Sequence, residues 1–397
     1  MTLENKINQI QIQNFTTESG AQYPVIQLSY QVFGPSLNSA PIVLVNHALT
    51  GNSQVIGAQG WWNDLIGESK TIDTLKYTIL AFNVPGNGFD GSLIANYQDF
   101  NARDIAKLFN QGIAILKIKQ LFAIIGGSVG GGIAWEMAAL EPEITQHLIP
   151  IATDWKSTDW LIANCFLQEQ ILSNSSKPIE DARIHAMLCY RTPESFSAKF
   201  QRTTNEELDV FNIESWLAHH GNKLQKRFQL SAYKMMNQLL KTIDITRGRD
   251  SFTAVASRIQ ADIHIIGIDS DLFFTANENR ATYEELKKYK ERGILVYGEF
   301  NGKKLYSDKD DLDSAYKKII GKTKAEFDEA ERIRHEEYKA EEKRHKDAIP
   351  ELTKEWIAKG NNVLDEKYRE RWAKCVPIRL DDLYQGMELK CCLDIAL

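Results

Sequence analysis

Ser128 lies in a glycine-rich segment whose pattern is typical of a catalytic serine. The segment reads GGSVG from Gly126 to Gly130, after the apolar run LFAII and before a helix-like stretch. A serine in a sharp turn between a strand and a helix exposes its hydroxyl above the sheet, in the arrangement called a nucleophile elbow. Side chains two residues before and after it would collide with the strand and the helix, which favours glycine at both positions. The pattern predicts that Ser128 is a nucleophile.

A glycine-rich phosphate loop or an ordinary tight turn also fits the G-x-S-x-G pattern alone. A P-loop is excluded, because no Gly-Lys-Ser/Thr follows the glycines. The strand-like run before Ser128 and the helix-like run after it favour the nucleophile over a plain turn.

A nucleophilic serine needs hydrogen-bond donors for the oxyanion that forms on its substrate. The N–H of Val129, at the start of the following helix, is one predicted donor. The second is expected from the loop after an earlier strand, and the N–H of Leu49 in VLVNHALTGNS is the candidate. His47 in that loop precedes the serine, which is the wrong order for a base of this fold, so we expect it to shape the loop.

Strand-like and helix-like segments alternate through the first 300 residues. Helix-like stretches at 102–117 and 131–142 separate apolar runs, several of them continuous, as in strands that are buried on both faces. This alternation predicts an α/β fold with a mostly parallel sheet. The expected strands span residues 24–34, 41–48, 77–84, 121–128, 147–153, 261–269 and 293–300.

The chain changes in character twice. In the middle, the strand signal fades and helices dominate, which is typical of a lid inserted between two late strands. Past residue 300, about 43 of the last 97 residues are Asp, Glu, Lys or Arg, against about 57 of the first 300. We therefore expect a core at 1–154 and 246–300, a helical lid at 155–245, and a charged helical segment at 301–397.

The charged segment carries a sparse apolar seam of Phe327, Ile333 and Tyr338. Pro350 is expected to interrupt or punctuate its helix. A solvated helix or a helical hairpin that packs by one narrow face is favoured over a coiled coil that binds a partner.

The bulk composition excludes several classes of protein. A net charge of −6 over 397 residues gives no basic surface for nucleic acid, and no apolar run approaches the roughly 20 residues of a membrane helix. The first 20 residues lack the pattern of a signal peptide. The five cysteines, an odd number without metal-ligand spacing, indicate reduced thiols. We expect a cytoplasmic protein that binds no metal, nucleic acid or membrane.

Six segments together resemble the homoserine O-acetyltransferase family of enzymes with the α/β-hydrolase fold. They follow one another in the family's order across about residues 10–290, and the combination is more specific than any single motif. The segments are NHALTGNSQVIG, GWWNDLIGESKTIDTLKYTILAFNVPGNGFDGS, IIGGSVGGGIAWEMA, LIPIAT, GNKLQKRFQLSAYKMMNQLLKTIDITRGRDSF and IIGIDSDLFFTANENR. The resemblance implies an α/β-hydrolase core with a helical lid.

The resemblance also implies acyl transfer in two steps. Acetyl-CoA would acylate the serine, and the hydroxyl of L-homoserine would then take the acetyl group, in a reaction that feeds methionine biosynthesis. Acetyl-CoA is thus expected as a co-substrate, with no bound cofactor. Homoserine and serine O-succinyltransferases share the framework, so the acyl donor and the acceptor stay open. Family members often dimerise through the lid, which implies a homodimer.

Some roles are implied residue by residue. Ser128 matches the family's nucleophile, and Asp271, in the segment DSDLFF, matches the acid of its catalytic triad. Asp269 is a nearby alternative acid, because both aspartates end a strand in the second half of the core. The N–H groups of Leu49 and Val129 match the oxyanion hole.

Arg227 and Tyr233 match lid residues that face the substrate. A guanidinium suits the carboxylate of homoserine, which it can bind with two parallel hydrogen bonds. An exposed lid arginine without a ligand is the alternative for Arg227. The family usually has Asp where Gln229 stands and Met where Val129 stands, which bears on the preference for acceptor and acyl donor.

The histidine of the triad is absent from its expected place. The family has it in a Gly-His-Asp segment after the last strand, but here GILVYGEF is followed by NGKKLYSDKDDL. After Asp271 only His335 and His345 remain, and we interpret both as helix-surface residues. Loss of a triad member lowers the rate by about 10⁴ to 10⁶.

Three explanations compete for the missing histidine. The tail replaces the family's own end through a fusion or a truncated reading frame, or the chain is a non-catalytic member that binds acyl-CoA or homoserine, or the charged segment supplies a base. We favour the first, because composition and family likeness change at the same place. The sequence thus predicts a ping-pong O-acyltransferase without an identifiable base. An inactive binding protein and a serine ester hydrolase are the alternatives.

Overall fold

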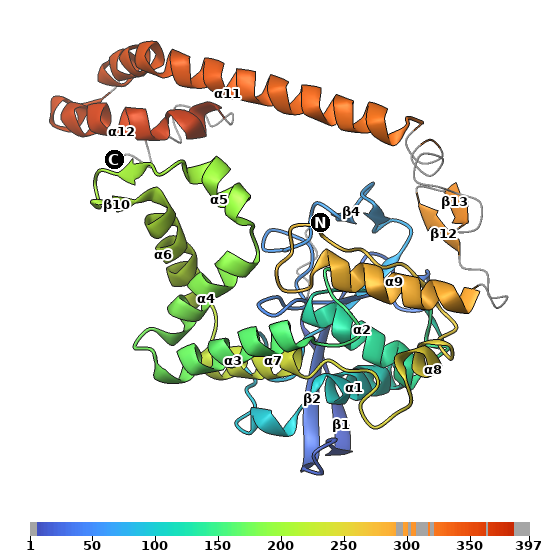
Figure 1. Cartoon of the computed structure of the whole chain (residues 1–397). Coiled ribbons are helices and arrows are strands. Elements are labelled where there is room, and N and C mark those ends of the chain that lie inside the picture. Colours follow the sequence, from blue (N-terminus) through green and yellow to red (C-terminus); the bar gives the residue numbers. More distant parts are fainter. Residues whose placement is uncertain are drawn as a thin grey trace. The chain divides into compact units, whose positions relative to one another are not determined.

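The chain folds into two compact units, Met1–Gly298 and Glu299–Leu397. The computed structural model describes residues 6–290, 297–300, 303–306, 317, 321–362 and 364–384. Figure 1 shows a sheet with helices around it in the first unit and two long helices in the second.

Strands and helices alternate along the first unit, as the α/β fold predicted from the sequence requires. Its elements are β1 (Asn8–Thr16), β2 (Gln22–Phe33), β3 (Ile42–Asn46), β4 (Ile66–Gly67), β5 (Ile72–Asp73), β6 (Thr78–Phe82), the 3₁₀ helix η1 (Tyr97–Asp99), α1 (Ala102–Ile115), β7 (Leu121–Gly127), α2 (Val129–Leu140), β8 (Thr145–Ile151), α3 (Asp159–Asn174), α4 (Pro178–Cys189), α5 (Pro193–Phe200), β9 (Thr204–Asn205), β10 (Val210–Phe211), α6 (Asn212–Gln225), α7 (Leu230–Lys241), α8 (Phe252–Ala256), β11 (Asp262–Ile263) and α9 (Ala276–Lys290). They are followed by β12 (Tyr297–Phe300), β13 (Lys303–Tyr306), α11 (Lys324–Asn361) and α12 (Glu366–Tyr384).

Seven strands form the central sheet in the order β1-β2-β6-β3-β7-β8-β11. The pairs β1–β2 and β2–β6 are antiparallel, whereas all pairings from β6 to β11 are parallel. The predicted mostly parallel sheet is therefore confirmed. Since the carboxyl ends of parallel strands share one edge of a sheet, the loops after β3, β7 and β8 lie near one another.

The inner strands are buried on both faces, which explains their continuous apolar sequences. In β3, Ile42 and Leu44 belong to one hydrophobic cluster, and Val43 and Val45 belong to the other. The second cluster is covered by residues 55–77, which include β4 and β5. A one-residue shift in register would thus exchange the two cores.

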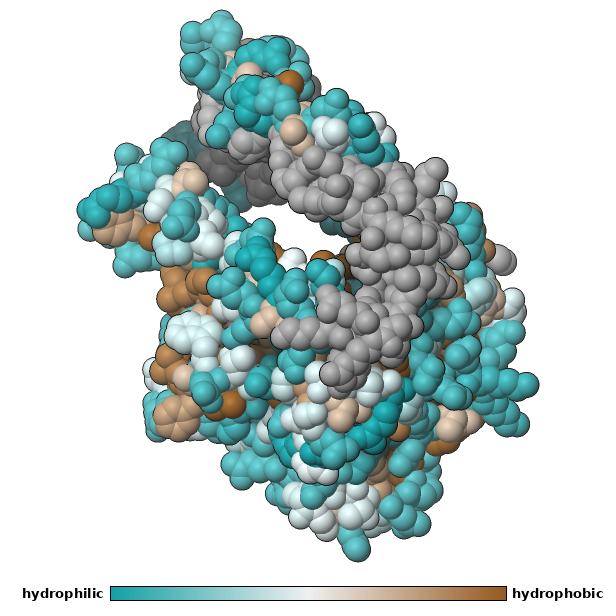
Figure 2. Space-filling model, turned by 45° about the vertical axis from the view of Figure 1, so that its right-hand side comes forward, coloured by the Kyte–Doolittle hydropathy of each residue, from teal (hydrophilic) through white to brown (hydrophobic). Residues whose placement is uncertain are grey.

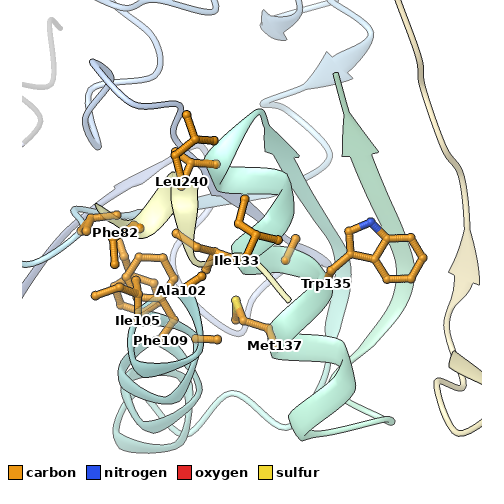
Figure 3. Close-up of a cluster of buried hydrophobic side chains, with 14 of the residues drawn as sticks. Phe82, Ala102, Ile105, Phe109, Ile133, Trp135, Met137 and Leu240 are labelled. Carbon is orange, nitrogen blue, oxygen red and sulfur yellow. The ribbon is translucent and has the colours of Figure 1, made fainter. Parts of the chain in front are cut away.

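The first cluster fixes α2, the helix that follows Ser128. Figure 3 shows Phe109 of α1 and Met137 of α2 in this cluster, with Phe82 of β6 beside α1. Trp135 of α2 points away from α1 and lies 6.2 Å from the ring of Phe252. Helix α2 is therefore held on both sides, which gives a rigid support to the turn before it.

Helices α3 to α7 lie in residues 155–245, which we call the lid. The side-chain amide of Asn237 on α7 donates to the carbonyl oxygen of Cys165 on α3 at 2.9 Å. The hydroxyl of Ser157 donates to the carbonyl oxygen of Leu240 at 2.5 Å. Buried polar contacts of this kind lock the lid helices to one another.

Two predicted strands differ from the structure. The strand expected at 261–269 is shorter in the structure, where β11 has two residues and one isolated bridge joins Ile151 to Ile266. It lies at the edge of the sheet and pairs with β8 alone. The strand expected at 293–300 is described only from residue 297, since residues 293–296 lie outside the described part. That portion, β12, pairs with β13 and not with the central sheet.

The charged segment forms a helical hairpin of α11 and α12. Pro350 does not interrupt α11, because neighbouring residues of high helix propensity continue the helix on both sides of it. Trp372 of α12 is buried, and its indole N–H donates to the carbonyl oxygen of Trp356 at 3.0 Å. A Cβ at Gly360 would collide with this indole, so glycine permits the close approach.

The predicted seam of α11 is only partly described. Ile333 is exposed, and the side chains of Phe327 and Tyr338 lie outside the described residues. No helix in the described residues is long and apolar enough to cross a membrane. Figure 2 shows a mostly hydrophilic face with separate apolar patches.

Glu136 on α2 is the centre of a buried ion cluster in the first unit. Nε of Arg103 lies 3.0 Å from Glu136 Oε2, and Nη1 of Arg249 lies 3.3 Å from the same oxygen. Arg103 also donates to the carbonyl oxygens of Asp244 and Arg247, at 3.0 and 2.7 Å. The cluster therefore joins α1 and α2 to the segment that returns from the lid.

Glu136→Gln should destabilise the first unit, because it keeps the side-chain volume but leaves the buried Arg103 with Glu18 as its one remaining described acidic partner. We expect the free energy of unfolding to fall by about 3 kcal/mol or more, measured by urea denaturation with tryptophan fluorescence. Asp250→Asn is the control, because it breaks an exposed ion pair with Arg258. Its loss should stay below about 1 kcal/mol, and equal losses in the two variants would contradict the assignment.

Candidate active site

Ser128 occupies a strained turn between β7 and α2. Its backbone has φ 54° and ψ −126°, a conformation that non-glycine residues adopt rarely. The N–H of Ser128 donates to the carbonyl oxygen of Ile151 on β8 at 2.9 Å. Its carbonyl oxygen accepts from the N–H groups of Gly131 and Gly132, at 2.9 and 3.2 Å. The backbone on both sides of the side chain is thus fixed.

The glycines around Ser128 are required by close contacts. A Cβ at Gly126 would collide with the carbonyl oxygen of Gly130, and a Cβ at Gly130 would collide with that of Asn46 in β3. A Cβ at Gly131 would collide with the side chain of Thr153. These contacts match the reason that the sequence pattern gives for glycine two residues before and after the serine.

Of the two expected oxyanion donors, one belongs to the residue after Ser128 and the other to a residue that lines the same cavity. Val129 is the first residue of α2, and its N–H donates to no protein group among the described residues. The N–H of Leu49, in the turn after β3, likewise has no acceptor there. The side chain of Leu49 and Ser128 line the same small cavity. Both amides are therefore available to a ligand.

His47 holds the loop after β3 in place. Its Nδ1 lies 2.8 Å from the carbonyl oxygen of Ala48, and its Nε2 accepts from the N–H of Val84 at 3.0 Å. The ring is 1% exposed, and burial lowers its pKa to about 4. A neutral imidazole with both nitrogens engaged cannot take a proton from Ser128. The predicted role of His47 in shaping the loop is confirmed.

The cavity at Ser128 measures about 20 Å³ and is partly covered by lid residues. It is lined by Leu49, Ser128, Gln168, Ala186, Tyr190, Tyr233, Asn237, Leu240 and Phe273. Tyr233, one of the two lid residues expected to face the substrate, is thus brought to the serine. It is 2% exposed, and burial raises the pKa of its hydroxyl.

Asp271 lies in the loop between β11 and α9. Its Oδ1 accepts from the N–H groups of Phe273 and Phe274, at 2.7 and 3.1 Å, and Phe273 reaches the Ser128 cavity. Burial raises the pKa of this carboxyl. The side chain of Asp269, in contrast, is 89% exposed and pairs with Arg280. Of the two aspartates, Asp271 is the one with a fixed and partly desolvated carboxyl.

Arg227 of the lid reaches the loop that carries Leu49. Its Nη1 donates to the carbonyl oxygen of Thr50 at 3.0 Å. Burial and the neighbouring charge of Arg183 lower its pKa. The Arg183 guanidinium lies 5.3 Å from the ring of Tyr190, which lines the cavity. Neither Arg227 nor Arg183 has a described acidic partner. The region next to the Thr50 loop and Tyr190 is therefore suited to bind a carboxylate.

No histidine lines the cavity among the described residues. His185 is near it, but its Nδ1 lies 2.8 Å from the amide nitrogen of Gln168 and faces that group. His335 and His345 lie on α11 in the second unit, and their side chains are outside the described residues. No three His, Cys, Asp or Glu side chains in the described chain are grouped for a metal ion.

Sequence reasoning missed Gln168, Asn237 and Arg183 as residues of this site. They lie on α3, α7 and α4, and only the packing of these helices brings them together. A polar residue in a helix has no local pattern that separates a buried position from a solvated one.

Comparison with known proteins agrees with the resemblance seen in the sequence. Residues 41–208 match the family model described as alpha/beta hydrolase fold. The homoserine O-acetyltransferase of Trichormus variabilis is 33% identical over 294 residues, which cover 67% of this chain and 80% of that protein. That of Cyclobacterium marinum is 32% identical, over 71% of this chain and 86% of that protein.

A solved structure gives the same result. The crystal structure of homoserine O-acetyltransferase from Staphylococcus aureus matches with a TM-score of 0.62 and 27% identity, over 71% of this chain and 85% of that one. The fold is thus that of the α/β hydrolases, with Ser128 at the turn where their nucleophile stands. The chain belongs to the homoserine O-acetyltransferase family.

Proposed function

We propose that this chain is an acyl-CoA-dependent O-acyltransferase that acetylates L-homoserine through an acyl group on Ser128. Acetyl-CoA is the co-substrate, and the product feeds methionine biosynthesis in the cytoplasm. The observation that carries the proposal is the strained turn at Ser128, with two unpaired N–H groups beside it. This arrangement suits attack on a thioester, because the donors stabilise the charge that develops on the carbonyl oxygen.

The proposed reaction has two halves. In the first, Ser128 Oγ bonds to the carbonyl carbon of acetyl-CoA, loses its proton, and the C–S bond breaks to release CoA. The proton of Ser128 leaves in net terms with the CoA thiol. In the second half, the homoserine hydroxyl oxygen bonds to the same carbon, the Ser128 ester bond breaks, and the homoserine hydroxyl proton returns in net terms to Ser128 Oγ. The N–H groups of Leu49 and Val129 hold the oxyanion in both halves.

The proton of Ser128 has no identified acceptor. In the proposed triad, Asp271 would orient an imidazole, and its Oδ2 has no hydrogen-bond partner among the described residues. Without that imidazole, the serine stays protonated near neutral pH, and catalysis comes from binding and the oxyanion hole alone. We therefore propose an impaired acyltransferase rather than a fast one.

Acetylation should be confined to Ser128. Incubation of the full chain with acetyl-CoA is expected to add one acetyl group, seen by intact mass and located by peptide mapping, and Ser128→Ala should lose it. Cys165 and Cys189 should not take the acetyl group, because burial raises the pKa of their thiols to about 12 and about 11. An adduct that persists in Ser128→Ala would contradict the assignment.

The pH dependence of acetylation should reveal the base. If no side chain takes the proton, the rate should rise about tenfold per pH unit from pH 6 to 9, and added imidazole should increase it. A plateau above about pH 7 that disappears in His335→Ala or His345→Ala would instead identify a base from the charged segment. The measurement is the rate of acetyl incorporation from labelled acetyl-CoA.

Arg227 is proposed to bind the carboxylate of homoserine. Arg227→Gln should therefore raise the KM for homoserine about tenfold to a hundredfold, because a charge-assisted hydrogen bond is lost. Acetylation of Ser128 in the absence of homoserine should not change. Lys226→Gln, at an exposed neighbouring position, is the control and should alter neither step. Equal loss in both half-reactions would mean that Arg227 supports the loop of Thr50 instead.

Experiments can distinguish the proposed acyltransferase from the two alternative functions that the sequence suggests. An inactive binding protein would bind acetyl-CoA or homoserine and show no adduct and no turnover. A serine ester hydrolase would hydrolyse small acetyl esters at Ser128 without needing homoserine. Release of acetate from small esters without homoserine would favour the hydrolase, and transfer of the acetyl group to homoserine would favour the acyltransferase.

A homodimer through the lid is part of the same proposal. Trp160, Ile162, Phe166 and Leu167 of α3 are 53%, 39%, 61% and 45% exposed, which is unusual for large apolar side chains in one helix. Light scattering should give about twice the chain mass, and Phe166→Glu should reduce it to the single chain. A monomer at all micromolar concentrations would overturn this part.

A further inference from the structure

The cavity at Ser128 contains two buried carbonyl oxygens that lack a hydrogen-bond partner. They are Oε1 of Gln168 on α3 and Oδ1 of Asn237 on α7. Both side chains line the cavity, and each residue is 3% exposed. A buried carbonyl without a donor is unfavourable, so two of them at one small cavity call for a ligand that donates hydrogen bonds.

The orientation of both amides is fixed by the protein. The Asn237 amide nitrogen donates to the carbonyl oxygen of Cys165 at 2.9 Å. The Gln168 amide nitrogen donates to that of Ala182 at 3.0 Å. Rotation of either amide by 180° would set two carbonyl oxygens against each other, so the oxygen must remain the unpaired end. Both amide nitrogens are thus engaged with the lid, that of Gln168 with His185 Nδ1 as well, at 2.8 Å, and both residues offer an acceptor oxygen.

The rest of the lining narrows the chemistry of the ligand. Leu49, Leu240 and Phe273 are apolar, and the described lining includes no Lys, Arg, Asp or Glu side chain. An ammonium group carries three donors and no acceptor, whereas a hydroxyl needs a donor for itself as well. The cavity volume of about 20 Å³ accepts a group of this size.

We propose that Gln168 and Asn237 bind the α-ammonium group of the acceptor amino acid beside Ser128. This inference rests on the proposed function, since it assigns the acceptor's position in that site. The carboxylate of the same molecule would lie toward Arg227, whose guanidinium contacts the loop next to Leu49. Acceptor oxygens then bind the ammonium group of the amino acid, and a guanidinium binds its carboxylate. This pair of contacts favours an α-amino acid over a simple alcohol.

Binding to the full chain without acetyl-CoA tests this assignment. Calorimetry would compare L-homoserine, L-2-aminobutyrate, which lacks the hydroxyl, and 4-hydroxybutyrate, which lacks the ammonium group. The unaltered chain should bind 4-hydroxybutyrate at least tenfold more weakly than either amino acid. Equal binding of the three compounds, or binding of none, would overturn the proposal.

Two variants test the residues themselves. Asn237→Leu and Gln168→Met preserve much of the side-chain volume, remove one acceptor each, and should weaken both amino acids at least tenfold while leaving 4-hydroxybutyrate within about twofold. Asn110→Leu is a matched control, because Asn110 on α1 is also buried, donates to a backbone carbonyl and has an unpaired Oδ1, but lies outside the cavity lining. It should lower the melting temperature without changing any affinity.

The outcomes separate this inference from the proposed function. A loss of affinity shared by all three compounds in both variants would make Gln168 and Asn237 structural residues and overturn the inference. Acetylation located at Ser128 with no difference between homoserine and 4-hydroxybutyrate would leave the acyltransferase intact and remove only the ammonium site. Selective ammonium binding without acetylation would support the site and count against the enzyme.

Discussion

The structure depends on one strained backbone position. Ser128 has φ 54°, which costs about 1–3 kcal/mol for a residue with a side chain. The cost is tolerated because β7 and α2 are both held by the core, and because Gly126 and Gly130 allow the strand and the helix to meet without collision. This one conformation raises the hydroxyl above the sheet and points the start of α2 at the same space.

The lid gives the site its electrostatic character. By covering Ser128 with α3, α4 and α7, it removes water from groups that would otherwise be solvated. Burial raises the pKa of Asp271, so its carboxylate is less stable until a partner arrives. Arg227 is an exposed lid residue, and partial burial of its guanidinium and the neighbouring charge of Arg183 lower its pKa. An imidazole would be the partner for the first and a carboxylate for the second. The core fixes the position of Ser128, and the lid residues would determine which substrate binds next to it.

Features that depend on neighbouring residues could be predicted from the sequence, whereas contacts between distant segments could not. The elbow, the donors at Leu49 and Val129, and the parallel strands follow from short patterns, because steric contact within a few residues decides them. Gln168 and Asn237 do not, because they meet only after α3 and α7 pack. β1 also escapes prediction, since it is mostly polar and half exposed at the sheet edge. Pro350 stays within α11 because an exposed helix can lose one hydrogen bond to water.

The proposed site contains candidates for oxyanion stabilisation and for acceptor binding, whereas no base is identified for Ser128 among the described residues. Oxyanion stabilisation is usually the largest single contribution to acyl transfer, and the proposed donors at Leu49 and Val129 would provide it through backbone N–H groups. The proposed ordering of the acceptor by the lid would likewise be independent of the base, since it would use neutral amides and guanidinium groups. Only the removal of one proton from Ser128 depends on an imidazole. If no imidazole takes that proton, binding and turnover are separated, and each can be measured alone in this chain.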